Sequence, residues 1–278
     1  MKTKLSLYSI IICCLLLTEG YAQSGWLNNF RLAQSAAKAN NKLILVDFWA
    51  TWCGPCKRMD MEVWSTADAQ KIKQNFIPLK IDIDSEKAIA AQYNIRSIPN
   101  LILMDYNGKV IHSYVGYSSK TDLMSFIENI PADASSLNEK LLKDLDKQDL
   151  TMNQAKDIAL AYQDLSKAVK YSPLQQSFLQ ESEKYLKKAS KKASNETELN
   201  EIELWSSLNS IIRGKSKKVI ATLTEEKGKY ENTANEVLLN FVLLCAYKEI
   251  GDKASYDTAL ASLKSKPEGE RLAKLVDK

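Results

Sequence analysis

The sequence has a single histidine among its 278 residues, and this scarcity limits the metal chemistry open to it. That residue, His112, falls in an alternating, strand-like pattern where a solvent-facing or hydrogen-bonded side chain is expected. A zinc site needs about four ligands. The nearest candidate ligands, Cys53 and Cys56, supply only two. We therefore expect no metal site.

Cysteine is also scarce, with five in the chain. Cys13 and Cys14 fall in the N-terminal segment, and neither follows the small residue that usually precedes a lipid-modified cysteine. The remaining three, Cys53, Cys56 and Cys245, are fewer than a disulfide-stapled secreted domain carries, and their number is odd. A bridge between Cys53 and Cys56 closes too small a loop to stabilise much through chain entropy. Packed cores must hold the fold, and the pair needs another explanation.

A strong excess of charge of one sign is absent. The net charge is +4, and lysines and acids are interspersed, as on solvated helix faces. Nucleic acid is therefore not an expected partner.

The N-terminal hydrophobic run is too short for a membrane span. Two lysines precede a mostly apolar stretch over residues 5–17, whereas a spanning helix needs about 20 residues. Gly20 and Ala22 supply small residues before a cut at Gln23. The pattern predicts a secretory signal peptide over 1–22, with an uncleaved anchor as the alternative.

Strand and helix patterns alternate in the first half of the mature chain. Helical spacing covers 24–42, with Trp26, Phe30, Ala33 and Ala37 as its apolar positions. A buried strand follows, and Asn107-Gly108 is a strong hairpin signal. The expected elements after the first helix are a strand over 42–50, a helix over 54–75 with a break near 65–66, a strand over 76–84, a helix over 85–94, a hairpin over 100–117 and a helix over 121–130. This order predicts an α/β domain over 23–132, with a central mixed sheet covered by helices on both faces.

The pattern changes after Pro131. A small, polar stretch over 131–140 indicates a boundary, and 137–278 shows helical spacing with almost no strand signal. We expect an all-α domain over 137–278. The segment 235–264 weakly resembles a tetratricopeptide unit, and the alternative is an irregular helical bundle.

The pair in "WCGPCK" suits redox chemistry. Cys53 falls between a predicted strand and a predicted helix. The free amides and the positive dipole at the start of that helix stabilise a thiolate. Pro55 suits the first helical turn, Cys56 returns to the same face, and Lys57 adds positive charge. Cys53 is thus the expected nucleophile, and Cys56 the residue that resolves the mixed disulfide.

The resolving cysteine needs a proton acceptor. Asp47 lies on the apolar strand before the pair, within "LILVDFW". A carboxyl group in apolar surroundings has a raised pKa and can take a proton near neutral pH. We therefore predict Asp47 as that acceptor.

The segment "LILVDFWATWCGPCK" resembles the active-site segment of the thioredoxin family, nearly residue for residue. Further matches follow in order: "LKIDID", "IRSIPN", "NGKV" and "YVGY". The resemblance covers about residues 26–130 and implies the thioredoxin fold and a thiol-disulfide oxidoreductase that needs no cofactor.

The resemblance also implies roles for individual residues. Lys80 would lie near the buried Asp47 and tune it, and Pro99 would be cis and face the dithiol. The residues expected to contact a substrate are Trp52, Gly54, Pro55, Ile98, Pro99 and Gly116.

Two positions depart from the family pattern. Met61 replaces a helix-kinking proline, and Asn100 stands where threonine is common. The pattern is closer to thioredoxin-like modules of the bacterial envelope, including the soluble domain of membrane thiol-disulfide interchange proteins. Together with the N-terminal segment, this predicts a secreted protein of the bacterial periplasm.

The expected activity is reduction of protein disulfides, because a Gly-Pro dipeptide between the cysteines favours a reductant. A membrane thiol-disulfide reductase is the expected electron donor. A disulfide oxidase or isomerase is the alternative within the same chemistry. In an alternative of another class, the chain is a redox-switched adaptor whose helical domain binds an unknown protein. Cys245, within "FVLLCAY", is expected to be a buried small hydrophobe.

Overall fold

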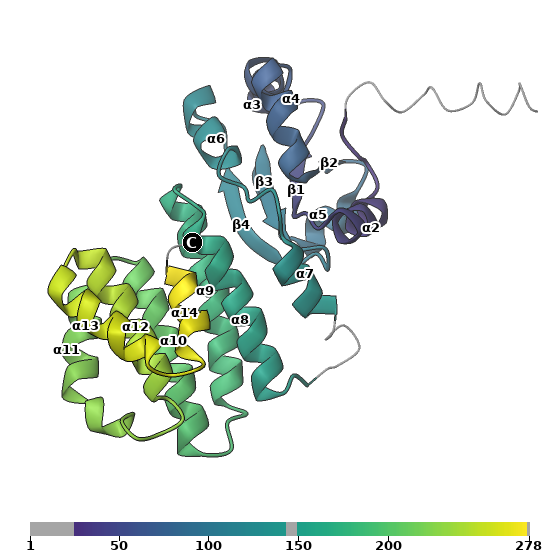
Figure 1. Cartoon of the computed structure of the whole chain (residues 1–278). Helices are drawn as coiled ribbons and strands as arrows, with labels where there is room; N and C mark the ends of the chain where they lie inside the picture. Colours follow the sequence, from purple (N-terminus) through teal and green to yellow (C-terminus); the bar gives the residue numbers. More distant parts are fainter. Residues whose placement is uncertain (1–24, 143–148, 277–278) are drawn as a thin grey trace, which may run out of the picture. The chain divides into compact units, whose positions relative to one another are not determined.

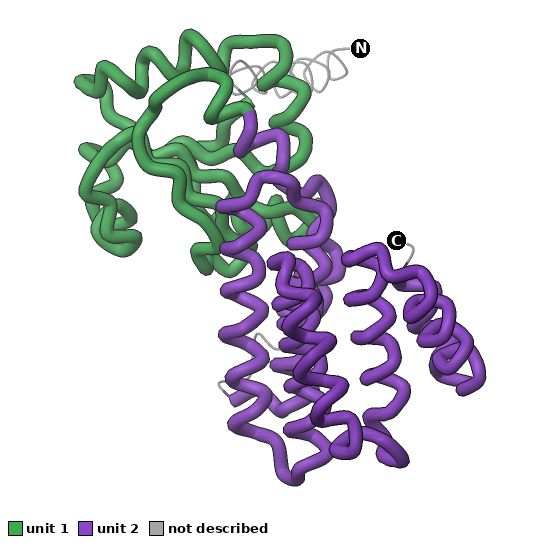
Figure 2. Tube along the Cα trace, turned by 90° about the vertical axis from the view of Figure 1, so that its left-hand side faces the viewer, with its two compact units in different colours: residues 1–124 green, residues 125–278 purple. Residues whose placement is uncertain are grey.

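A computed structural model of the chain describes residues 25–142 and 149–276. It divides into two compact units, residues 1–124 and 125–278, which Figure 2 draws in separate colours. The division falls inside helix α6 (Lys120–Ile127). The domain boundary expected between residues 132 and 137 stays a prediction. The predicted signal peptide over 1–22 lies outside the described residues.

The first unit is built on a four-stranded sheet flanked by helices (Figure 1). The strands are β1 (Ile44–Trp49), β2 (Ile77–Asp82), β3 (Asn100–Met104) and β4 (Val110–Val115), in the spatial order β2-β1-β3-β4. β1 runs parallel to β2 and antiparallel to β3, and β3 pairs with β4 through the predicted hairpin. The mixed sheet of the predicted fold is therefore confirmed.

β1 lies between β2 and β3 in the sheet, and every residue from Ile44 to Phe48 is buried. Its apolar residues are branched or aromatic and favour a strand between two others. The same strand carries the ionisable Asp47 into the core and delivers the chain to the Cys53 segment.

The helices of this unit are α2 (Phe30–Asn40), α3 (Gly54–Met59), α4 (Ala67–Ile72) and α5 (Lys87–Gln92), followed by α6. A π-helical segment, η1 (Asp60–Trp64), continues α3, and a 3-10 turn, η2 (Lys73–Asn75), continues α4. The predicted break near 65–66 is confirmed: Thr66 caps the start of α4 by accepting from the amide of Ala69.

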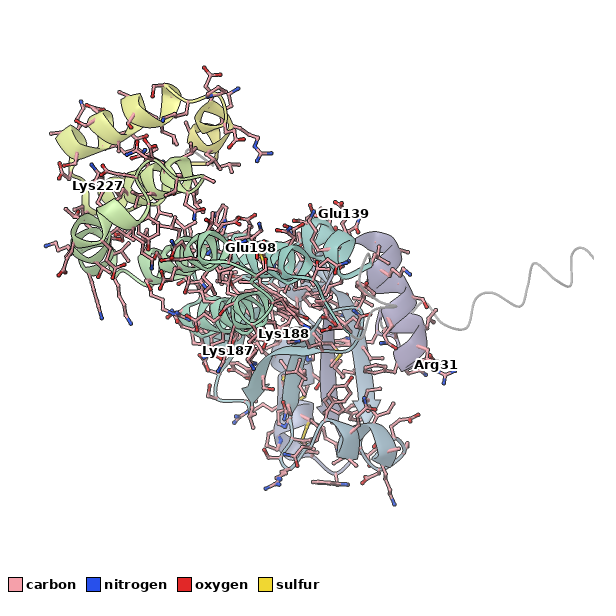
Figure 3. The ribbon with its side chains drawn as sticks, turned by 90° about the horizontal axis from the view of Figure 1, so that it is seen from below. Arg31, Glu139, Lys187, Lys188, Glu198 and Lys227 are labelled. Atoms are coloured by element: carbon pink, nitrogen blue, oxygen red, sulfur yellow. A yellow bond between two sulfur atoms is a disulfide. The ribbon has the colours of Figure 1, made fainter. Side chains whose placement is uncertain are left out.

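The first helix begins later than the predicted residue 24. Asn29 caps α2, since its Oδ1 accepts a hydrogen bond of 2.9 Å from the amide of Leu32. Leu27 instead forms a parallel bridge with Leu79 on β2. The backbone groups before Asn29 thus find partners in the sheet, which outweighs the helical spacing of Trp26 and Phe30. Exposed Arg31 extends from the outer side of α2 (Figure 3).

The second unit is helical throughout its described part, as predicted. Its helices are α7 (Ser135–Leu142), α8 (Met152–Lys167), α9 (Ser172–Ser190), α10 (Glu196–Ile212), α11 (Ser216–Glu225), α12 (Glu236–Ile250), α13 (Lys253–Lys264) and α14 (Gly269–Val276), with a 3-10 turn, η3 (Lys227–Lys229). Lys187 and Lys188 extend from the exposed face of α9 (Figure 3).

The helices pair as neighbours in sequence, and α8, α10 and α12 open successive pairs at residues 152, 196 and 236. These spacings of 44 and 40 residues exceed the roughly 34 residues of a tetratricopeptide unit. The tetratricopeptide resemblance stays a prediction. A buried polar network joins three of the helices: Gln163 donates to Asn209 at 2.8 Å, and Asn209 donates to Ser182 at 3.1 Å. Because each buried group needs its partner, the network fixes the register of α8, α9 and α10.

Candidate active site

Cys53 and Cys56 form a disulfide at the start of α3, with their Cα atoms 5.3 Å apart. β1 ends at Trp49, and the Cys53 amide closes a turn by donating to the Ala50 carbonyl at 3.1 Å. The Cys53 side chain is the helix cap, because its Sγ accepts from the Cys56 amide at 3.2 Å. When the pair is reduced, the same amide can stabilise a thiolate on Cys53. Neither cysteine protrudes, with exposed fractions of 3% and 1%.

Asp47 is fully buried on β1, where the strand register places it opposite Lys80 on β2 and Leu101 on β3. Burial raises the pKa of Asp47 to about 7, and the Lys80 charge opposes that rise. Neither carboxylate oxygen has a hydrogen-bond partner. The Lys80 Nζ lies 3.7 Å from Oδ2, which is an ion-pair distance rather than a hydrogen bond. The predicted proximity of Lys80 to this acid is confirmed.

Lys80 has a second acidic partner that sequence reasoning missed. Its ammonium donates a hydrogen bond to Oδ1 of Asp60, in the π-helical segment η1. The rings of Trp26 and Trp49 flank the same ammonium at 5.5 Å and 5.3 Å. Spacing offered a signal, because Asp60 follows Cys56 by four residues and so shares its side of the helix.

The Ile98–Pro99 peptide bond is cis, as the resemblance implied. Ile98 packs against the cluster of Ala50, Cys53 and Cys56, so this loop lies beside the disulfide. The Gly116 amide donates to the Pro99 carbonyl at 2.8 Å, and its φ of 84° is one that glycine adopts readily. The structure thus brings Ile98, Pro99 and Gly116 together, and their contact with a substrate stays a prediction.

Trp52, the residue before Cys53, is 65% exposed, although tryptophan is usually well buried. It lines a hollow of about 330 Å³ together with Ile83, Ile95, Arg96, Ser97 and Ile98. Its Nε1 donates to Oδ2 of Asp84 at 2.8 Å, a partner that the sequence did not suggest. Gly54 and Pro55 form the first turn of α3, and a Cβ on Gly54 would meet no atom within 4 Å. The surface beside the disulfide therefore has open space at Gly54 and a partly apolar hollow at Trp52.

Sequence reasoning missed a set of contacts, formed by Arg58, Glu62 and Tyr117, between the cysteine helix with its continuation η1 and the loop after β4. Arg58 donates to the Tyr117 carbonyl at 3.0 Å and lies over the Tyr117 ring, and Tyr117 in turn donates to Glu62 at 2.5 Å. Burial and Glu62 raise the pKa of Tyr117 to about 12, so its hydroxyl keeps its proton at neutral pH. Because Tyr117 follows Gly116, these contacts also restrain Gly116 relative to α3.

The two departures from the family pattern have different settings. Met61 is 69% exposed within η1, where the chain adopts a π-helical turn in place of a proline kink. Asn100 is buried at the start of β3, and its side-chain oxygen has no hydrogen-bond partner.

The remaining predicted positions lie elsewhere. His112 is on β4, and burial lowers its pKa. Within residues 25–142 and 149–276, no group of three or more His, Cys, Asp or Glu side chains could hold a metal ion. Cys245 is a free thiol on α12, and burial raises its pKa to about 11. It is half-buried rather than fully buried. No helix among the described residues is long and apolar enough to cross a membrane.

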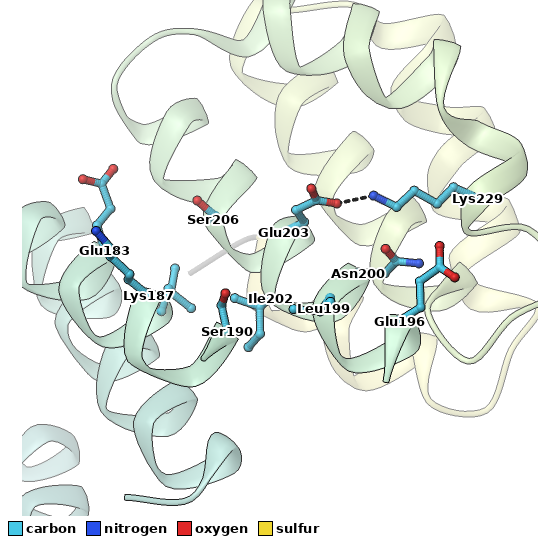
Figure 4. A pocket seen from close by; sticks show the side chains of 11 residues that line it. Glu183, Lys187, Ser190, Glu196, Leu199, Asn200, Ile202, Glu203, Ser206 and Lys229 are labelled. Carbon is cyan, nitrogen blue, oxygen red and sulfur yellow. Dashed lines mark hydrogen bonds and ion pairs between the residues drawn. The ribbon is translucent and has the colours of Figure 1, made fainter. Parts of the chain in front are cut away.

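The helical unit has a hollow of its own, of about 540 Å³, between α9, α10 and η3. Figure 4 shows its charged lining, in which Lys229 pairs with Glu203 and the side chains of Glu183 and Lys187 stand on α9. Acids and bases alternate with Leu186, Leu199 and Ile202 in its wall.

Comparison with known proteins gives consistent matches to thioredoxins. The family model Thioredoxin matches residues 28–129. Thioredoxin of Haemophilus influenzae is 42% identical over 86 residues, which cover 30% of this chain and 76% of that protein. Thioredoxin of Staphylococcus saprophyticus is 40% identical over 84 residues, covering 30% and 78%. A solved thioredoxin structure from Nicotiana alata is 28% identical, covers 39% of this chain and 94% of that one, and has a TM-score of 0.32.

Proposed function

Because this chain belongs to the thioredoxin family and carries its redox pair as a thiol-disulfide oxidoreductase, we propose that it reduces protein disulfides in the bacterial cell envelope. The observation that carries the proposal is the Cys53–Cys56 pair at the start of α3, just after the strand β1 that holds Asp47 buried. Direction, location and residue roles are parts of the proposal.

The reaction begins from the dithiol form. The Cys53 thiolate attacks one sulfur of a substrate disulfide, so a Cys53–substrate bond forms, the substrate disulfide breaks and a substrate thiolate leaves. Cys56 then attacks the sulfur of Cys53. The mixed disulfide breaks, the second substrate thiol departs, and the Cys53–Cys56 disulfide forms. The substrate gains two electrons, and the cysteine pair loses two.

Asp47 accepts the Cys56 proton in the second step, directly or through one water. A general base works best when its pKa lies near the working pH, and that of Asp47 is about 7. Lys80, held near this acid by the β1–β2 register, tunes its proton affinity.

The substrate backbone lies across the surface formed by Trp52, Gly54 and Pro55 on one side and Ile98 and Gly116 on the other, next to the buried Pro99. The open space at Gly54 supports this use, because a disulfide inside a protein substrate must reach Cys53 together with its flanking chain. Trp52 and Ile98 offer apolar contact beside the sulfur atoms.

The location rests on the signal-like pattern over 1–22. Expression of the full chain in a Gram-negative host, followed by fractionation and mass spectrometry, tests it. A periplasmic product that begins at Gln23 supports the proposal, and a cytoplasmic product that keeps Met1 overturns it. Deletion of residues 2–22 is the matched control, which should remain in the cytoplasm.

The reducing direction rests on the Gly54-Pro55 dipeptide. The redox potential of the pair in the mature chain, titrated against glutathione or dithiothreitol, tests it. A value near that of thioredoxins, about −270 mV, supports a reductase supplied with electrons by a membrane thiol-disulfide reductase. A value above about −180 mV, the range of disulfide isomerases, overturns that direction and favours disulfide formation or shuffling.

The helical unit is proposed to bind a protein partner, and the observation that favours this is the hollow between α9 and α10 (Figure 4). If the chain is a redox-switched adaptor, partner binding should survive loss of both Cys53 and Cys56 and fail when the hollow is altered by Lys187→Glu. If the chain is an oxidoreductase alone, Lys187→Glu should leave every interaction unchanged.

A further inference from the structure

Two carboxylates of unequal exposure share the ammonium group of Lys80. Lys80 donates its hydrogen bond to Asp60, whose side chain is 35% exposed. It stands 3.7 Å from Asp47, whose side chain is 1% exposed. The buried carboxylate is thus left without any hydrogen-bond partner, while the half-exposed one takes the hydrogen bond.

Desolvation alone would favour the opposite arrangement, in which Lys80 donates its hydrogen bond to the buried Asp47. A carboxylate buried away from water gains most from a full hydrogen bond with a cation, and a half-exposed one gains little beyond what water gives. Asp60 lies on η1, and the π-helical turn places its carboxylate beside the end of the Lys80 side chain. The rings of Trp26 and Trp49 flank the ammonium and limit where it can move.

Among the described residues, the charged groups that act on Asp47 are Lys80 from β2 and Asp60 from η1, and the indole of Trp64 is a neutral polar neighbour. Lys73 from η2 acts on Lys80 and lies over the Trp26 ring at 5.3 Å. Lys73 itself has a lowered pKa, because of burial and the nearby Lys80. Removal of Asp60 therefore leaves Asp47 as the acid to which Lys80 can turn.

We propose that Asp60 is a positioning residue that holds Lys80 off Asp47 and so keeps the buried carboxyl able to take up and release a proton. The importance of Asp60 for turnover rests on the proposed role of Asp47 as proton acceptor. The influence of Asp60 on the proton affinity of Asp47 does not depend on that role.

Two consequences of losing the Asp60 charge act in the same direction. The repulsion between the two carboxylates disappears, and Lys80 becomes free to move closer to Asp47. Both favour the ionised form of Asp47, so its pKa should fall by about one unit. The shift would leave Asp47 a weaker base at pH 7.

The test is a titration of the Asp47 carboxyl carbon by NMR in the full mature chain, with the cysteine pair reduced and oxidised. Asp60→Ala removes both the charge and the hydrogen-bond acceptor, and Asp60→Glu keeps both. Asp68→Asn is the matched control, because Asp68 is an exposed acid on α4 without a contact to Lys80. Asp60→Ala should lower the titration midpoint of Asp47 by about one unit, whereas Asp60→Glu and Asp68→Asn should leave it within about 0.3 unit.

An unchanged or raised midpoint in Asp60→Ala overturns the proposal, and so does an equal shift in Asp68→Asn. The pH dependence of protein-disulfide reduction then separates this proposal from the role of Asp47. If the midpoint falls and the pH profile moves with it, the proposed roles of Asp60 and of Asp47 are both supported. If the midpoint falls while the profile stays, Asp60 still raises the proton affinity of Asp47, and Asp47 is not the proton acceptor.

Discussion

The indole of Trp52 donates a hydrogen bond of 2.8 Å to the carboxylate of Asp84, which joins the residue before Cys53 to the loop after β2. The ring is held in place although 65% of its surface is exposed. An aromatic side chain that is already ordered loses little entropy when a partner packs on it. If Trp52 contacts a substrate as proposed, its ring is already ordered before the substrate arrives.

Loss of the Asp84 acceptor should weaken substrate docking and leave the chemistry intact. We expect Asp84→Ala to raise KM for a protein disulfide about fivefold, as a net hydrogen bond contributes about 1 kcal/mol, with kcat nearly unchanged. A small aromatic disulfide, which needs no extended docking surface, should be reduced at the normal rate.

Asp84→Asn is the matched control, because its amide oxygen can still accept from the indole. It should behave as the unmodified protein. An equal loss in Asp84→Asn and Asp84→Ala, or a fall in the rate with the small disulfide, would contradict docking through an ordered Trp52.

The buried carboxyl of Asp47 should make stability depend on pH. Its pKa is raised from 3.8 to about 7, mainly by burial. Between these values the unfolded chain has released the proton while the folded chain retains it, so stability falls as the pH rises from about 4 to 7. Three units correspond to about 4 kcal/mol, an order-of-magnitude figure. Asp47→Asn removes this dependence.

Urea denaturation of the oxidised mature chain at pH 4 and pH 8 checks the prediction. Asp47→Asn should increase the free energy of unfolding at pH 8 by a few kcal/mol, up to about 4, and change it little at pH 4. A gain of the same size at both pH values would mean that packing, rather than ionisation, differs between the two side chains. Asp68→Asn serves as the exposed control.

Substitution of Cys53, Cys56 and Cys245 should have three different effects on the reduction of protein disulfides. Cys53→Ser removes the nucleophile and should abolish reduction of protein disulfides. Cys56→Ser should still attack but accumulate mixed disulfides, because nothing resolves them. Cys245→Ser should keep full activity, since a thiol with a pKa of about 11 holds almost no thiolate at neutral pH. An assay of protein-disulfide reduction measures the activity of all three variants, and non-reducing gels detect the mixed disulfides. Mixed disulfides in Cys53→Ser would contradict the assignment of Cys53 as the nucleophile.

Local patterns in the sequence were sufficient for the core of the site. The cysteine spacing, the apolar strand around Asp47 and the hairpin at Asn107-Gly108 each act over a few residues, so each could be interpreted alone. The position of Lys80 came from the family resemblance, and the register of β1 with β2 bears it out.

What escaped prediction depends on segments far apart in the chain. Asp60 and Asp84 become partners of Lys80 and Trp52 only once β2 lies beside β1 and η1. The start of α2 was placed too early for the same reason, because Leu27 pairs with a strand about 50 residues later. Periodicity cannot reveal such a competing partner.

The last helix should depend on a glycine at its start. A Cβ on Gly269 would lie 1.8 Å from the carbonyl oxygen of Leu263, which is backbone and cannot swing aside. Gly269→Ala should therefore push α14 away from α13 at a cost of about 1–3 kcal/mol. Gly228→Ala is the matched control, because a Cβ there meets nothing within 4 Å. Hydrogen exchange of the backbone amides over 253–276 should rise at least about fivefold in Gly269→Ala and stay unchanged in Gly228→Ala. Equal protection in both variants would mean that α13 and α14 are not packed as closely as the structure places them.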